Sequence, residues 1–193
     1  DSTAEAPNTE NLGLENLGVA IGDHGVIVDE GMRTNIPNIY AAGDIVGRYK
    51  LSHVAAMEGG VAGENAMGGN GVARYETTPR CVYTIPEAAF VGLTEKQAID
   101  RGHKIKTATM PLSANAAARV RWEGEGVVKM IVDQDRGVIL GVHILGPRAT
   151  DLIAESALAM VFEASPDILS QVVHAHPTLA EALKDIASSV HEG

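Results

Sequence analysis

Apolar and polar residues alternate most clearly in the second half of the chain, where the pattern predicts paired strands. Residues 127–133 and 138–145 are the two clearest strands, and Asp135-Arg136-Gly137 between them has the composition of a turn. Together they predict an antiparallel hairpin. Shorter runs at 80–84, 88–92 and 104–110 predict further strands of one mainly antiparallel sheet.

Helical periodicity follows these strands. Residues 149–164 carry apolar side chains at helical spacing, residues 166–173 predict a shorter helix, and residues 178–191 predict the last one. Thr94 is the expected cap of a further helix, which Gly102 ends. We expect helices 149–164 and 178–191 to pack on the sheet, so the fold class is α+β, an antiparallel sheet with flanking helices.

The first third of the chain has a different pattern. Residues 26–29 and 39–42 predict strands, and the second has the continuous apolar composition of a buried strand in a parallel sheet. Residues 51–67 predict a helix rich in small residues, with Ser52 as its expected N-cap. The glycines of segment 68–71 are incompatible with a stable helix and indicate a domain boundary.

Three segments follow from this boundary. We expect a disordered lead or a cloning remnant at 1–6, a partial α/β domain at 7–70, and a second domain at 71–193.

Composition and charge exclude several classes of function. The net charge of −10 argues against nucleic acid and anionic membrane surfaces as partners. No apolar run approaches the roughly 20 residues of a membrane helix. Cys81 is the only cysteine, so no disulfide can form within the chain. It is typical of a small buried hydrophobe, and we expect a cytoplasmic protein without a metal site.

A candidate for acid–base chemistry precedes the last predicted helix, in residues 174–178, His-Ala-His-Pro-Thr. Thr178 and Glu181 have the spacing of a capping box, which predicts a helix beginning at Thr178. His176 would lie in the preceding loop, where the Glu181 carboxylate could fix its tautomer and raise its basicity, as a general base requires. Spacing alone favours the alternative, in which Glu181 only caps the helix and both histidines are surface residues.

A candidate ligand-binding turn ends the predicted strand at 39–42. Gly43 allows a sharp turn and the close approach of a ligand. Asp44 would present a carboxylate at the carboxyl edge of the strand, where open α/β sheets bind ligands. On its own, an ordinary Gly-Asp turn is the simpler interpretation.

Residues 174–183 resemble the active-site segment of the class I pyridine nucleotide-disulfide oxidoreductases, and residues 34–44 resemble their second flavin-binding motif. The closest branch is the one that oxidises dihydrolipoyl groups. The resemblance covers residues 7–193 but only the C-terminal part of the usual chain, the end of the FAD domain and the dimer-interface domain. It implies that His176 is the acid–base catalyst for a dithiol and that Glu181 orients it.

The resemblance also implies cofactor contacts. Asp44 would hydrogen-bond the ribityl chain of FAD. Leu51, Ser52 and His53 match the start of a helix that points at the pyrimidine edge of the flavin, where its positive end would stabilise the reduced ring.

Further segments resemble the interface domain, namely residues 84–88, 91–95 and 144–147, although Ile85 stands where the family has histidine. The resemblance implies a homodimer, because in this family the interface domain of one subunit completes the active site of the other. Electrons pass from a lipoyl-type or other small dithiol through a disulfide and FAD to NAD. The resemblance also implies a cis bond between His176 and Pro177.

Some parts of such an enzyme are missing from the sequence. There is no Gly-x-Gly-x-x-Gly after a strand and no cysteine pair. We therefore expect this chain alone to bind no FAD and to be inactive, whereas the whole enzyme would use FAD and NAD. One alternative is a dimerisation module without catalysis. Another is a related disulfide reductase with a different substrate, although residues 188–191 lack the cysteine pair of a mercuric reductase.

Overall fold

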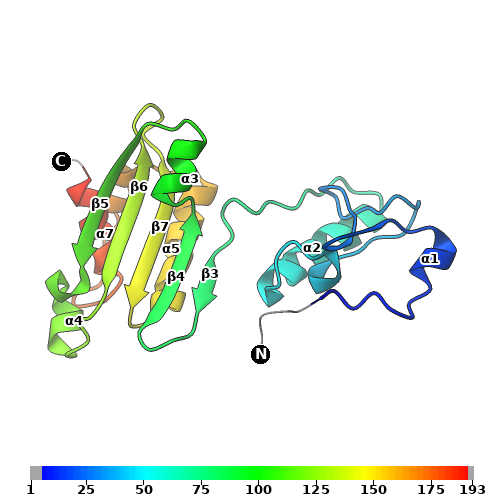
Figure 1. The fold of residues 1–193 in the computed structure, drawn as a ribbon. Helices are drawn as coiled ribbons and strands as arrows, with labels where there is room; N and C mark the ends of the chain where they lie inside the picture. Colours follow the sequence, from blue (N-terminus) through cyan, green and yellow to red (C-terminus); the bar gives the residue numbers. More distant parts are fainter. Residues whose placement is uncertain (1–5, 191–193) are drawn as a thin grey trace. The chain divides into compact units, whose positions relative to one another are not determined.

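The chain forms two compact units, residues 1–75 and 76–193, in a computed structural model that describes residues 6–190 (Figure 1). The division follows Tyr75, a few residues beyond the glycine-rich segment 68–71. Each unit has its own hydrophobic core. The predicted lead lies outside the described residues except for Ala6. Within residues 6–190, no helix is long and apolar enough to span a membrane, and no cluster of side chains is suited to a metal ion.

The second unit is built on a five-stranded antiparallel sheet in the order β3-β4-β7-β6-β5 (Figure 1). Its strands are β3 (Arg80–Val82), β4 (Glu87–Gly92), β5 (Ile105–Pro111), β6 (Val127–Asp133) and β7 (Ile139–Gly146). The prediction of an antiparallel sheet is confirmed, and so is the hairpin that β6 and β7 form.

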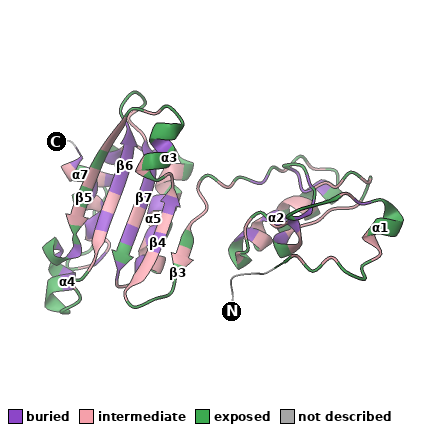
Figure 2. Ribbon diagram, in the orientation of Figure 1, coloured by how far each residue is buried: buried purple, intermediate pink, exposed green. Residues whose placement is uncertain are grey.

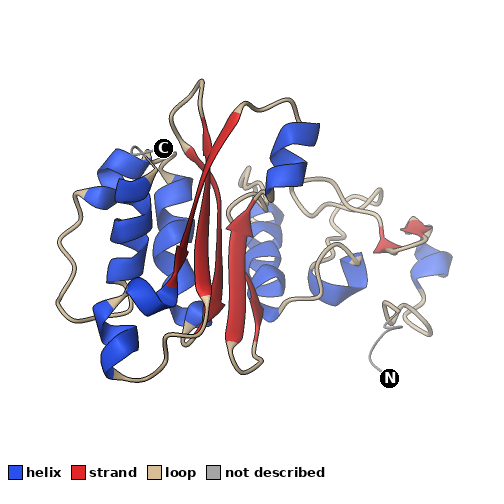
Figure 3. Ribbon diagram, turned by 60° about the vertical axis from the view of Figure 1, so that its left-hand side comes forward, coloured by secondary structure: helices blue, strands red, loops and turns tan. Residues whose placement is uncertain are grey.

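Helices flank this sheet (Figure 3). They are α3 (Glu95–Asp100), α4 (Ala116–Val120), α5 (Ala149–Val161), α6 (Pro166–Ser170) and α7 (Glu181–Ser189), with a 3-10 turn at Leu112–Ala114. Helix α5 packs on β4 and β7, and α7 packs on β5 and β6, as expected. The sequence did not predict α4. The last helix begins at Glu181 rather than at Thr178.

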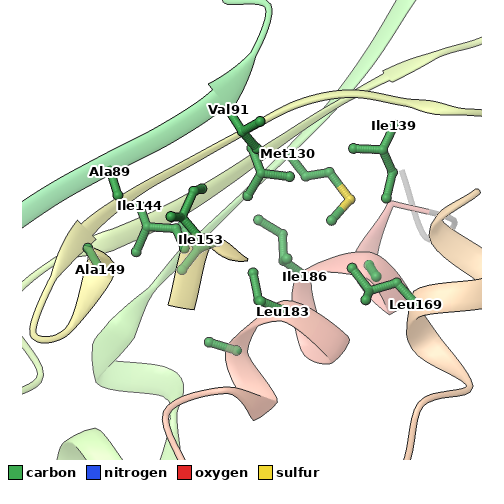
Figure 4. Packing of buried hydrophobic residues seen from close by; sticks show 14 of the residues in the cluster. Ala89, Val91, Met130, Ile139, Ile144, Ala149, Ile153, Leu169, Leu183 and Ile186 are labelled. Atoms are coloured by element: carbon green, nitrogen blue, oxygen red, sulfur yellow. The ribbon is translucent and has the colours of Figure 1, made fainter. Parts of the chain in front are cut away.

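The main core lies between one face of the sheet and helices α5 and α7. Val128 and Met130, which alternate along β6, belong to this core together with Ile153 of α5 and with Leu183 and Ile186 of α7. Figure 4 shows Met130 pointing from the sheet toward the helices. Every second residue of the strands, and residues three or four apart on the helices, thus contribute their apolar side chains to one layer. Buried residues follow the central strands, whereas exposed ones cover the outer faces of α3 and α4 (Figure 2).

Helix α3 covers the opposite face of the sheet. Its Ala98 packs with Ile131 and Leu140, which alternate with the residues of the main core. Thr94 caps the helix in a full capping box with Gln97. Gly102 ends the helix at a φ of 84°, a left-handed conformation that glycine adopts without strain. Both predicted ends of this helix are confirmed.

The first unit has little regular structure besides one long helix. Its elements are α1 (Leu14–Leu17), β1 (Ile21–Gly22), β2 (Gly25–Val26), a 3-10 helix η1 (Gly43–Val46) and α2 (Ser52–Ala66). The strand expected at 26–29 is reduced to β2. Helix α2 has Leu51 at its N-cap position, one residue before the predicted Ser52.

The buried strand predicted at 39–42 is wrong. This segment forms only an isolated antiparallel bridge, between Tyr40 and Arg33. The amide of Ala41 donates to the carbonyl of Met32, and the amide of Thr34 donates to the carbonyl of Ile39. The backbone of this segment therefore forms its hydrogen bonds locally, because residues 6–190 supply no parallel strand beside it.

Candidate functional site

The loop of residues 171–180 joins α6 to α7 and carries both candidate histidines. Its C-terminal half is anchored on α4. The buried side chain of Leu179 packs against Ala117 and Ala118. Asn115, the N-cap of α4, donates from Nδ2 to the carbonyl of Thr178 at 3.0 Å. The short helix that the sequence did not predict therefore positions the loop.

His176 and Glu181 are brought together, as predicted. Nδ1 of His176 lies 2.9 Å from Oε1 of Glu181, and Oε2 of Glu181 accepts a hydrogen bond from the Thr178 amide at 2.8 Å. The His176 side chain is 70% exposed, whereas that of Glu181 is 19% exposed. The expected cis bond between His176 and Pro177 is present.

The capping box expected from Thr178 and Glu181 is only half formed. Glu181 reaches back to the Thr178 amide, as the box requires. The Thr178 hydroxyl, however, donates to the carbonyl of Ala175, and Ala180 occupies the N-cap position. This part of the prediction was wrong because the Thr178 hydroxyl forms a local hydrogen bond with the Ala175 carbonyl instead of with the helix. Capping and pairing with His176 are not alternatives in this loop, because each uses a different oxygen of Glu181.

The electrostatics of the pair favour an ionised Glu181. The Thr178 amide, and then the His176 ring, hold the pKa of Glu181 below the usual range of a glutamate, with a smaller contribution from His174. An ionised Glu181 accepts the Nδ1 proton of His176, so a neutral His176 ring has its lone pair on Nε2. No hydrogen bond within residues 6–190 occupies that atom. Nε2 of His176 can therefore accept a proton from a group in solution.

His174 has a partner that the sequence analysis missed. Its Nε2 lies 2.9 Å from Oε1 of Glu155 on α5, and its Nδ1 lies 3.2 Å from the carbonyl oxygen of Val172. The side chain is only 7% exposed. Because Glu155 is 19 residues away in the sequence, short-range spacing gives no signal for this contact.

The candidate cofactor residues lie in the first unit, at the start of η1 and of α2. Gly43 is buried with a φ of 80°, whereas Asp44 is exposed. Leu51 is half-buried, and Ser52 and His53 are exposed. The N-terminus of α2 has no side-chain cap and no acidic residue in its first turn. Its positive end is therefore compatible with an electron-rich ligand.

A buried carboxylate, which the sequence analysis also missed, forms hydrogen bonds that hold this region in place. Glu58 of α2 is 1% exposed. Its Oε2 accepts the Gly43 amide at 2.7 Å, and its Oε1 accepts the Tyr75 hydroxyl at 2.8 Å. Burial, together with the hydrogen bond to Glu58, raises the pKa of Tyr75. Glu58 therefore fixes the backbone that precedes Asp44.

Cys81 is half-buried and packs on the main core. Burial raises the pKa of its thiol, which keeps the sulfur protonated. The residue is thus less buried than expected, but it serves as a small apolar side chain.

Comparison with known proteins gives two family matches. Residues 78–187 match the dimerisation domain of the pyridine nucleotide-disulphide oxidoreductases, and residues 5–59 match the family described as pyridine nucleotide-disulphide oxidoreductase.

Similar curated proteins include the dihydrolipoyl dehydrogenase of Bacillus subtilis, 42% identical over 187 residues, which are 96% of this chain and 40% of that protein. The mitochondrial dihydrolipoyl dehydrogenase of Schizosaccharomyces pombe is 43% identical over 93% of this chain and 35% of its own length. The chain thus spans about two fifths of the curated relatives it matches.

Among solved structures, LpdA from Mycobacterium tuberculosis is similar with a TM-score of 0.90 and 33% identity, over 96% of this chain and 41% of that chain. The flavoprotein disulfide reductase RclA from Escherichia coli has a TM-score of 0.89 and 29% identity, over 97% of this chain and 44% of that chain.

Proposed function

Because the chain belongs to the pyridine nucleotide-disulphide oxidoreductases, we propose that it forms the C-terminal part of a flavin-dependent enzyme that oxidises dihydrolipoyl groups. The observation that carries the proposal is the contact between His176 and Glu181, which joins an exposed imidazole to an ionised carboxylate. The similarity to dihydrolipoyl dehydrogenases supports the choice of substrate.

In this proposal His176 is the base and Glu181 orients it. Nε2 of His176 accepts the proton of a substrate thiol, and the resulting thiolate attacks a disulfide that the rest of the enzyme supplies. Glu181 holds the Nδ1 proton and stabilises the imidazolium that forms. The reverse transfer from Nε2 returns the proton to a leaving thiolate.

FAD, when bound, supplies the two-electron acceptor that passes electrons on to NAD. Asp44 would bind the ribityl hydroxyls, and the bare backbone at Gly43 would allow close approach. The start of α2 at Leu51, Ser52 and His53 would face the electron-rich edge of the ring. The exposed Asp44 carboxylate and the uncapped helix end fit these roles.

The enzyme would act as a homodimer in a reducing compartment, the cytoplasm. The match to a dimerisation domain supports self-association. So do the apolar side chains that the second unit exposes at Tyr83 and Ile85. The single half-buried cysteine needs no oxidising environment.

The test is substrate oxidation by the full-length protein. We expect a stoichiometric flavin spectrum and NAD reduction by dihydrolipoamide, with kcat/KM exceeding that for reduced glutathione by at least about 100-fold. Preference for glutathione would contradict the substrate assignment. A full-length protein without flavin would support the second candidate, a dimerisation module. The self-contained core of the second unit favours that candidate.

A further inference from the structure

The loop that carries His176 is fixed by different contacts on its two sides. On the C-terminal side, Thr178 binds Asn115 and Glu181 through its backbone, and Leu179 is buried against α4. On the N-terminal side, the His174 ring links the loop to α5 through Glu155. His176 lies between these two anchors.

Both nitrogens of His174 face acceptors. One is a carboxylate oxygen of Glu155 at 2.9 Å, and the other is the carbonyl oxygen of Val172 at 3.2 Å. The ring is therefore held at both nitrogens, and the contact with Glu155 is the one that links it to another element of the fold. A hydrogen bond to a carboxylate is stronger and shorter than one between two neutral groups. The His174 side chain, which is almost fully buried, thus has the hydrogen-bond partner that a buried polar group requires.

Glu155 is well placed to act as a rigid anchor. Its neighbours Ile153 and Ser156 on α5 are buried, and the helix packs on β4 and β7. The carboxylate itself is 31% exposed and lies at the edge of this packed region. A side chain that projects from a well-packed helix holds its partner more precisely than one on a loop.

We propose that His174 and Glu155 are a positioning pair, which holds the N-terminal side of the loop on α5 so that His176 keeps its alignment for proton transfer. The inference rests on the proposed function of His176. The titratable groups around His174 are Glu155 from α5, Glu181 from α7 and His176 from the loop itself. His174 carries no proton to substrate, because its nitrogens are both engaged and its side chain is buried.

The kinetic test compares Glu155→Ala, His174→Ala and the double variant in the full-length flavin enzyme. A displacement of about 1 Å in a reacting group can cost roughly 100-fold in rate. We expect each single variant to lower kcat for dihydrolipoamide by roughly 10- to 100-fold while KM changes by less than about threefold. The double variant should be no slower than the slower single one, because both remove the same link. Glu155→Gln keeps an acceptor and should retain more activity than Glu155→Ala.

Two controls separate positioning from general damage. Asp151→Ala removes an exposed acid from the same helix and should leave kcat unchanged. Ferricyanide reduction driven by NADH needs no dithiol and should be unchanged in every variant. Wild-type kcat in Glu155→Ala would overturn the proposal, and so would multiplicative losses in the double variant.

An NMR measurement tests the contact between His174 and Glu155 separately from the proposed role of His176 as the base. In the 193-residue chain, ¹⁵N–¹H correlations of the His174 imidazole should report its contact with Glu155, and Glu155→Ala should shift the Nε2 signal. A His174 Nε2 signal that Glu155→Ala leaves unchanged would overturn the pair whatever the kinetics show. Full activity in His176→Ala would instead overturn the proposed function while leaving the NMR result valid.

Discussion

Oε1 of Glu181 lies 2.9 Å from Nδ1 of His176, while Oε2 of the same carboxylate accepts the Thr178 amide at 2.8 Å. One side chain therefore closes the start of α7 and orients the histidine of the preceding loop. Because both donors need an oxygen, only a carboxylate satisfies them together.

Replacing Glu181 by glutamine tests this arrangement. The amide group of glutamine faces one of the two donors, so either Thr178 or His176 loses its acceptor. We expect kcat for dihydrolipoamide to fall by roughly 10- to 100-fold in the full-length enzyme, as when other orienting carboxylates are lost. Asp185→Asn, at an exposed acid of the same helix, is the control and should match the wild type. An activity for Glu181→Gln within about twofold of the wild type would contradict an orienting role.

The lowered pKa of Glu181 predicts a pH dependence of stability. The Thr178 amide and the His176 ring favour the ionised carboxylate in the folded state. A carboxyl with a lower pKa when folded adds stability above its unfolded pKa, about 4.3, and loses that contribution as pH falls through the folded pKa. The difference in melting temperature between wild type and Glu181→Gln should thus be largest near neutral pH and narrow below about pH 4.3. An unchanged difference between about pH 7 and about pH 3 would contradict this linkage.

The sequence predicted the second unit well because its signals are local. The hairpin of 127–145 has alternating strands and a turn of its own, and Thr94 has its capping partner three residues away. The contact between His176 and Glu181 also spans only five residues. Period and spacing are sufficient for such elements.

The remaining features depend on tertiary contacts. The segment 39–42 has the composition of a buried strand, but it pairs locally with residues 32–34 in this chain. Glu58 and Glu155 find their partners 15 and 19 residues away, beyond the reach of any local pattern. Thr178 does not cap the helix, because its hydroxyl donates to the carbonyl of Ala175.

The packing of the main core predicts that two isoleucines on helices contribute very differently to the free energy of unfolding. Ile186 of α7 is fully buried in this core, whereas Ile99 of α3 is mostly exposed. Replacing Ile186 by alanine should destabilise the second unit by about 2–5 kcal/mol. Ile99→Ala should change stability by less than about 0.5 kcal/mol. Urea unfolding measures both, and equal midpoints for the two variants would contradict this packing.

The chain alone is expected to self-associate without binding flavin. Its sequence has no glycine-rich phosphate turn, and Asp44 offers only one side-chain contact to a large cofactor. The exposed Tyr83 and Ile85 favour burial against a second copy. Light scattering on the purified chain should therefore give at least twice the monomer mass of 20.2 kDa, without flavin absorbance. A monodisperse monomer would contradict the association, and a stoichiometric flavin spectrum would contradict the expected lack of flavin binding.

The most direct test of the central claim is the first turnover of His176→Ala. The full-length oxidised enzyme is mixed rapidly with dihydrolipoamide, and the rate of dithiol oxidation is compared with that of the wild type at equal flavin content. If Nε2 of His176 accepts the thiol proton, this step should slow by roughly 10²- to 10⁴-fold, the usual contribution of a general base. Flavin binding should survive. Equal first-turnover rates would show that His176 does not take the proton and would contradict its role as the base.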